Sequence, residues 1–137
     1  MKITELHLLP ENKCGKLLKN GVILEAHEEN TAKFLTLYGF KINAIRPLNI
    51  PKMKNPDFLI DGAIWEMKAP STSNLKTIKK RMHNASEQVG RIVIDLRSVG
   101  KNYKKVESDI VKRFTSKSVF RAMILITKDG RVFYYNK

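Results

Sequence analysis

The sequence predicts an α/β protein with a mixed central β-sheet flanked by helices on both faces. Three observations predict this class: apolar residues recur at helical spacing in three segments, short apolar runs bounded by turn residues indicate strands, and the two kinds of segment alternate along the chain. A chain of 137 residues usually forms one domain. We expect that domain to cover residues 22–137, after an irregular lead-in over residues 1–21.

The first predicted element is a helix over residues 22–38. Residues at spacings of three and four share one of its faces, namely Leu24, Glu28, Thr31, Leu35 and Tyr38. Gly39 ends this helix, and residues 40–45 follow as a short strand. Residues 46–56 hold three prolines and several lysines, so we expect a loop there.

A β-hairpin is predicted next, because the Asp61-Gly62 pair between two apolar runs indicates a two-residue turn. Ile60 then pairs with Ala63, and the same register places Asp57 directly opposite Glu66. Side chains alternate between the two faces of a strand. One face therefore carries Asp57, Glu66 and Lys68 at its open end, and the other face is apolar, with Phe58, Ile60, Ala63, Trp65 and Met67.

The elements after this hairpin are a helix, a buried strand, a second helix and a second hairpin, at residues 74–89, 92–96, 103–117 and 120–135. The second hairpin turns at Asp129-Gly130. The predicted order is therefore α-β-β-β-α-β-α-β-β, which places strands and helices in separate layers.

The charges on the first hairpin predict a metal site. Two carboxylates directly across a ladder repel each other, and a divalent cation between Asp57 and Glu66 removes that cost. Oxygen ligands suit a hard ion such as Mg²⁺. A metal lowers the pKa of its bound water and polarises a phosphoryl oxygen, while the Lys68 ammonium can orient that water or balance developing charge. This arrangement fits phosphodiester hydrolysis. The alternative is an edge hairpin with solvated charges that Lys68 neutralises.

The charge balance favours a nucleic-acid partner. Lysine and arginine number 26 against 13 acidic residues, which gives a formal charge of +13 and attracts phosphate backbones. The alternative is a lysine-rich surface without a partner. Membrane binding is disfavoured, because no basic helix carries the large apolar face it needs. We also expect neither a signal peptide nor a transmembrane segment, so the expected site of action is cytoplasmic.

Pro56-Asp57 followed by Glu66-Met67-Lys68 resembles the PD-(D/E)XK nuclease superfamily. The wider stretch from Asn55 to Arg97 resembles the C-terminal tRNase domain of contact-dependent growth inhibition toxins, with matching segments at 56–62, 64–70, Gln88 and 92–96. The resemblance implies a restriction-endonuclease-like fold in which Asp57 and Glu66 bind a divalent metal, Mg²⁺ foremost, and Lys68 assists catalysis. Two origins fit it: a domain excised from a long secreted protein, or a stand-alone relative carried by a mobile element.

The resemblance further implies that Glu28 is a third metal ligand and that Gln88 helps to orient the reacting groups. Glu28 shares the apolar face of its helix, where an acid is otherwise unexpected. On the helix over 74–89, Arg81 and Asn84 lie beside the apolar face and are candidates to contact phosphate. They join Lys79 and Lys80 as candidate nucleic-acid contacts. Solvated helix surface is the alternative for all four.

The resemblance favours RNA, and tRNA in particular, over DNA as the substrate. A DNA endonuclease of the same fold is the first alternative, and a module that binds nucleic acid without cutting it is the second. An acidic immunity or inhibitor protein is an expected partner, because charge complementarity favours an acidic surface against a basic toxin.

Overall fold

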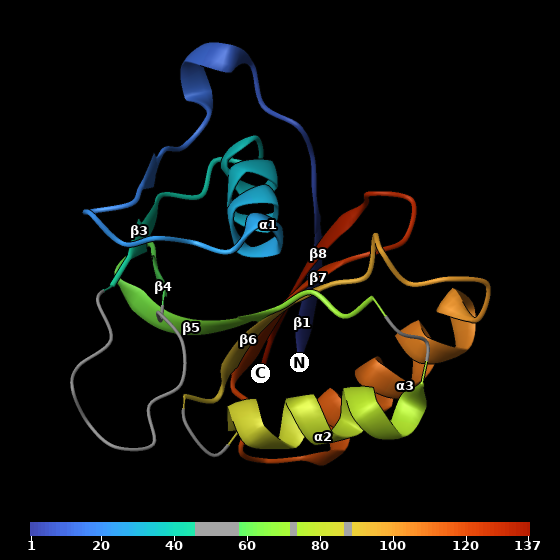
Figure 1. The fold of residues 1–137 in the computed structure, drawn as a ribbon. Helices are drawn as coiled ribbons and strands as arrows, with labels where there is room; N and C mark the ends of the chain where they lie inside the picture. The colour runs from blue at the N-terminus through green and yellow to red at the C-terminus, as the bar shows by residue number, and fades with distance from the viewer. Residues whose placement is uncertain (46–57, 72–73, 87–88) are drawn as a thin grey trace. The chain divides into compact units, whose positions relative to one another are not determined.

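The computed structural model describes residues 1–45, 58–71, 74–86 and 89–137. Eight strands form within these residues: β1 (Lys2–Leu6), β2 (Leu17–Leu18), β3 (Ile42–Ala44), β4 (Phe58–Ile60), β5 (Ala63–Lys68), β6 (Arg91–Asp95), β7 (Ala122–Ile126) and β8 (Val132–Asn136). The helices are η1 (Glu11–Lys13), a single 3₁₀ turn, and α1 (Ala26–Thr36), α2 (Leu75–Ser86) and α3 (Tyr103–Ser116). The strands are hydrogen-bonded in the order β1-β8-β7-β6-β5-β4-β3-β2 (Figure 1).

This sheet is mixed, which confirms the predicted α/β class. Strands β5, β6 and β7 run parallel to one another, as do β2 and β3, and the other neighbours are antiparallel. The chain divides into two compact units. Unit 1 contains residues 1–6 and 66–137, and unit 2 contains residues 7–65. Strand β5 contributes residues to both.

Unit 1 is built around an apolar cluster between its strands and the helices α2 and α3. Ile78 and Met82 of α2 and Val106, Ile110 and Phe114 of α3 are buried in this cluster. The spacing of three and four between these residues is the helical period that predicted both helices. The two helices lie side by side in Figure 1, and Ile92, Ile94, Met123, Leu125 and Tyr135 supply the sheet side of the cluster.

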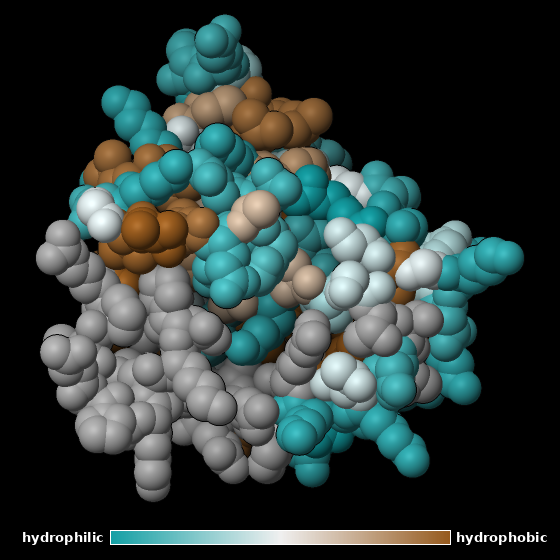
Figure 2. Space-filling model, viewed as in Figure 1, coloured by the Kyte–Doolittle hydropathy of each residue, from teal (hydrophilic) through white to brown (hydrophobic). Residues whose placement is uncertain are grey.

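Unit 2 packs α1 against its strands. Ala32, Leu35 and Ile42 are completely buried there. Gly39 follows the helix with φ +95°, a conformation that glycine adopts at little cost and that lets the chain turn back into β3. Large exposed apolar side chains gather in this unit, and brown surface is visible over it in Figure 2: Leu8, Leu9, Leu18, Ile23, Leu37 and Ile64.

Two sequence predictions differ from the structure. The expected irregular backbone over residues 1–21 is wrong for β1, which pairs with β8 along its whole length, and for β2. Strand β1 buries no complete face, with Ile3 half exposed, so hydrophobic alternation could not reveal it. The first helix begins at Ala26 rather than residue 22, because Glu25 caps it. The predicted loop over 46–56 lies outside the described residues.

Candidate active site

The β4–β5 hairpin has the predicted register. Asp61 and Gly62 both adopt positive φ angles, +49° and +87°, as a two-residue type I′ turn requires. Ile60 pairs with Ala63, and Phe58 pairs with Trp65. The Asp61 carboxylate also accepts the Lys41 backbone N–H at 3.1 Å, which ties the turn to the residue before β3. The local turn chemistry therefore fixes which side chains share a face.

The alternation of faces along β5 is confirmed. Trp65 and Met67 are buried on one face, and Ile64 on the other face is 43% exposed. Glu66 follows Trp65 and points to the opposite face, yet it is only 4% exposed. Its place in the strand explains this burial: Glu66 is aligned with Ile92 and Lys68 with Ile94 on the parallel strand β6. Both isoleucines belong to the cluster beneath α2 and α3.

Glu66 and Lys68 form an ion pair on this face. The Lys68 ammonium lies 3.8 Å from Glu66 Oε2, and the lysine side chain is about one quarter exposed while the glutamate is almost fully buried. Burying a carboxylate costs several kcal/mol, and an opposite charge at this distance recovers about 4 kcal/mol at an effective dielectric constant of ~20. The pair can thus hold an ionised carboxylate against the core with an ammonium at the solvent side.

Asp57 and Gln88 lie outside the described residues. The register determined up to Phe58 and Trp65 is the register on which Asp57 was predicted to face Glu66. The pairing of those two carboxylates stays a prediction, as does any role of Gln88.

Glu28 is buried in unit 2, as its helix phase predicted, and is 7% exposed. The structure supplies a local reason for this burial. Glu28 is the third residue of α1, and its Oε1 accepts the backbone N–H of Glu25 at 3.0 Å, while the Glu25 side chain accepts the N–H of Glu28. This reciprocal capping box satisfies two backbone donors at the helix start. Glu29, by contrast, pairs with Lys19 and Lys33, and their hydrogen bonds lower the pKa of its carboxyl.

Helix α2 carries the predicted nucleic-acid contacts. The Asn74 side chain accepts the backbone N–H groups of Lys76 at 3.0 Å and Thr77 at 3.4 Å, which caps the start of the helix. Lys79 and Lys80 are exposed. The backbone of Arg81 and Asn84 belongs to the same helix. Lys79 and Lys80 are therefore accessible, and their contact with nucleic acid stays a prediction.

Asp95 is not among the site residues that the sequence predicted. This carboxylate is 4% exposed at the end of β6, and Arg97 holds it with two parallel hydrogen bonds, Nε to Oδ1 at 3.0 Å and Nη2 to Oδ2 at 2.8 Å. Lys128 in turn donates to the Arg97 carbonyl at 2.9 Å. The bidentate geometry neutralises a buried acid and anchors the loop after β6.

A polar hollow in unit 1 was not predicted. It encloses about 380 Å³ and is lined by residues of α3 and of the β7–β8 turn: Tyr103, Lys104, Glu107, Thr127, Lys128, Asp129 and Arg131. Burial and the nearby Asp129 charge raise the pKa of the Glu107 carboxyl. The Thr127 hydroxyl donates to Asp129 and lowers the pKa of that carboxyl. These acids are 22 positions apart in the sequence, so no local pattern could join them.

Comparison with known protein families shows to which family this chain belongs. A family model described as "Contact-dependent growth inhibition CdiA C-terminal domain" matches residues 54–132, more than half of the sequence. The chain belongs to the CdiA C-terminal domain family. This is a family of toxin domains, and the matched residues include β4, β5, α2, β6, α3 and β7. No curated protein sequence matches this CdiA C-terminal domain.

A solved structure shares the fold. It is a CdiA-CT/CdiI toxin and immunity complex from Burkholderia pseudomallei, and it superimposes with a TM-score of 0.66 over 90% of this chain and 100% of that chain, at 22% sequence identity. Among the described residues of the present domain, none of the helices combines the length and apolarity needed to span a bilayer.

The described residues include only part of the predicted metal site. Within residues 1–45, 58–71, 74–86 and 89–137, no three carboxylate, imidazole or thiol side chains gather into a metal-binding cluster. The described part of this CdiA C-terminal domain thus supplies Glu66, a buried carboxylate of the kind that Mg²⁺ prefers. Metal binding by Asp57, Glu66 and Glu28 stays a prediction.

Proposed function

We propose that this CdiA C-terminal domain is a metal-dependent endonuclease of the PD-(D/E)XK type that cuts RNA, with tRNA as the leading substrate. The observation that carries the proposal is the Glu66–Lys68 pair: a buried carboxylate with an ammonium 3.8 Å away on the same face of one strand. Membership of a growth-inhibiting toxin family and a formal charge of +13 support an enzyme that acts on a polyanion.

The residues have separate roles in this proposal. Glu66, Asp57 and Glu28 would hold the metal through carboxylate oxygens, and Mg²⁺ is the leading candidate. When bound, that ion polarises a phosphoryl oxygen and lowers the pKa of its water. Lys68 lies beside the carboxylate, and its positive charge would stabilise the negative charge that develops on the phosphorane. Gln88 would orient the attacking water.

The remaining groups bind the substrate. Lys79 and Lys80 on α2 are exposed and would contact backbone phosphates, together with Arg81 and Asn84. Such contacts position the polymer without reading its sequence. Because tRNA is the leading substrate, the proposed site of action is the cytoplasm of a target cell. The related solved structure is a toxin and immunity complex, so we also propose that an acidic immunity protein binds this domain.

One assay tests the activity. Purified protein is incubated with total RNA and with plasmid DNA, each in Mg²⁺ or in EDTA. We expect RNA to be cut in Mg²⁺ only, and the Glu66→Gln variant to leave it intact. Cutting of DNA alone would favour the DNA endonuclease of the same fold. Unchanged cutting of RNA in EDTA would exclude the shared-metal site, and binding of nucleic acid without cutting would favour the non-catalytic module.

A further inference from the structure

Positive charge is distributed unequally between the two units. Unit 1 holds 18 lysines and arginines against 7 acidic residues, a formal excess of +11, while unit 2 holds 8 against 6, an excess of +2. A polyanion is therefore attracted mainly to unit 1. The α2 residues account for only part of this excess.

A second set of cations gathers where α3 ends and β7 begins. We define the α3–β7 rim by the side chains of Arg113, Lys117, Arg121 and Lys137. Backbone hydrogen bonds bring these residues together: Lys117 donates to the Arg113 carbonyl at 3.1 Å, and Lys137 donates to the Arg121 carbonyl at 3.1 Å. The Lys137 ammonium also donates to the Lys117 carbonyl at 2.7 Å.

The frame beneath this rim is tightly packed. Arg121 donates its backbone N–H to the Gly90 carbonyl at 2.7 Å. Gly90 has φ +74°, and a Cβ at this position would lie 2.7 Å from the Val119 carbonyl oxygen, so only glycine allows the close approach. Phe114 packs against Phe120, with 6.1 Å between ring centroids, and both rings are fully buried. The backbone that carries the rim residues is thus a fixed scaffold.

The ion pairs of the described residues leave the rim cations unengaged. Among the described residues, the ion pairs of unit 1 engage Lys68, Arg97 and Arg131, and none engages a rim residue. Arg113 Nε is buried without a hydrogen-bond partner in the described part of the chain. The Lys137 ammonium lies 4.6 Å from the Phe114 ring centroid, and burial lowers the pKa of this lysine. Cations that lie close together repel one another, and an anion between them relieves that repulsion.

We propose that the α3–β7 rim is a second contact surface for the RNA backbone, built from α3, β7 and β8 rather than from the candidate catalytic hairpin. The identity of the polymer as RNA rests on the proposed function. Lysine and arginine side chains on a fixed frame suit successive phosphates, and such contacts carry no sequence information. An acidic protein surface is the other polyanion that these charges could attract.

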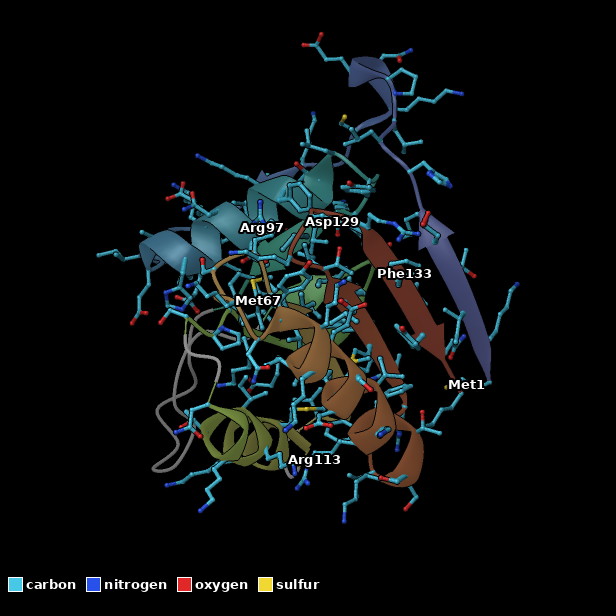
Figure 3. The ribbon with its side chains drawn as sticks, turned by 90° about the vertical axis from the view of Figure 1, so that its right-hand side faces the viewer. Met1, Met67, Arg97, Arg113, Asp129 and Phe133 are labelled. Atoms are coloured by element: carbon cyan, nitrogen blue, oxygen red, sulfur yellow. The ribbon has the colours of Figure 1, made fainter. Side chains whose placement is uncertain are left out.

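The test compares two variants with the same change of charge. The rim variant is Lys117→Gln with Arg121→Gln, both at exposed positions. The control is Lys101→Gln with Lys105→Gln, which are also exposed but lie at the other end of α3, where Lys105 is about 18 Å from Lys117 along the helix axis. In Figure 3, the labels of Arg113, a rim residue, and of Arg97, in the loop that precedes α3, lie well apart.

Binding is measured in EDTA by fluorescence anisotropy with a labelled single-stranded RNA of mixed sequence, over a series of salt concentrations. Loss of two phosphate contacts should lower the slope of log affinity against log salt by about 1.4, which corresponds to roughly 25-fold weaker binding at 0.1 M salt. The control variant should lose far less RNA affinity. A second RNA of different sequence should show the same loss, because phosphates are common to both.

Several results would overturn the proposal: equal losses in the rim and control variants, unchanged binding in the rim variant, or a rim-dependent affinity for DNA but not for RNA. A rim variant that loses an acidic protein partner while keeping RNA binding would assign the surface to that partner instead. Circular dichroism and melting curves check that both variants fold. Because binding in EDTA needs no cleavage, a chain that binds through the rim but never cuts would contradict the proposed function alone.

Discussion

Glu66 in unit 1 and Glu28 in unit 2 are both buried, but they differ in the groups that surround them. Glu28 accepts a backbone N–H and closes a capping box at the start of α1. Glu66 lies in the middle of a strand, with the Lys68 ammonium 3.8 Å from its Oε2. The capping box gives Glu28 a structural reason for its burial, whereas the cation beside Glu66 is a partner that catalysis can use. Burial of an acid therefore does not identify a catalytic site until its partners are known.

The largest expected effect concerns the acids proposed to share the metal. Glu66→Gln removes one negative charge at nearly constant volume and should lower RNA cleavage by about 10³-fold or more. Asp57→Asn should cause a similar loss, measured by the initial rate with Mg²⁺. Asp109→Asn on α3 is the control, since it removes an acid of unit 1 outside the hairpin. Full activity in Glu66→Gln would show that Glu66 has only a structural role, like the capping role of Glu28.

Replacement of the ammonium should have the next largest effect. Lys68→Met keeps the aliphatic stem and removes the charge, so cleavage should fall about 10²-fold to 10³-fold while metal binding persists. Isothermal titration with Mg²⁺ measures the binding separately from the rate. If the variant cuts at the parent rate, the ion pair serves only to neutralise Glu66, and the contrast between the two glutamates disappears.

Two substitutions of Glu28 separate its possible roles. Glutamine also closes a capping box, so Glu28→Gln should keep the melting temperature while removing the charge. Glu28→Ala should destabilise the fold by about 1 kcal/mol through loss of the cap. If Glu28 is a metal ligand, Glu28→Gln should already reduce cleavage in a protein of normal stability, and Glu29→Gln should not. Normal activity in Glu28→Gln would confine the chemistry to the hairpin.

The smallest effect concerns a third acid, Glu107, whose carboxyl has a raised pKa because of burial and the nearby Asp129 charge. A carboxyl with a higher pKa in the folded than in the unfolded state destabilises the fold above its folded pKa, and this penalty disappears as pH falls toward the unfolded value near 4.5. Glu107→Gln should therefore raise the melting temperature at pH 7, by at most about 3 °C because solvent screens a partly exposed group. The gain should vanish near pH 4. A gain that is independent of pH would show that charge is not its cause.

Local chemistry explains which parts of this fold could be predicted. The β4–β5 hairpin follows from Asp61-Gly62 and the alternation around it, and α3 follows from Val106, Ile110 and Phe114 at helical spacing. Strand β1 could not be predicted, because its pairing with β8 is made by main-chain groups and its side chains bury no full face.

In the candidate site, too, local patterns could be predicted and contacts between distant segments could not. Helix periodicity predicted that Glu28 is buried. Its capping role was missed because the N-cap residue, Glu25, is a glutamate, and glutamate is not among the preferred N-cap residues. The Glu66–Lys68 pair could be predicted because the two residues share one strand. The hollow around Glu107 and Asp129 could not, because α3 and the β7–β8 turn are brought together only by the tertiary fold.

The pairing of β1 with β8 has a consequence for how the chain folds. Lys2 pairs with Asn136, so the first strand of unit 1 finds its neighbour only after 134 residues, with all of unit 2 in between. Unit 2 is continuous in sequence and can condense while later residues are still being synthesised. Unit 1 must close a very long loop before its sheet is complete. High contact order of this kind slows folding, so we expect β1 to join last and its exchangeable amides to be protected later than those of β6 and β7.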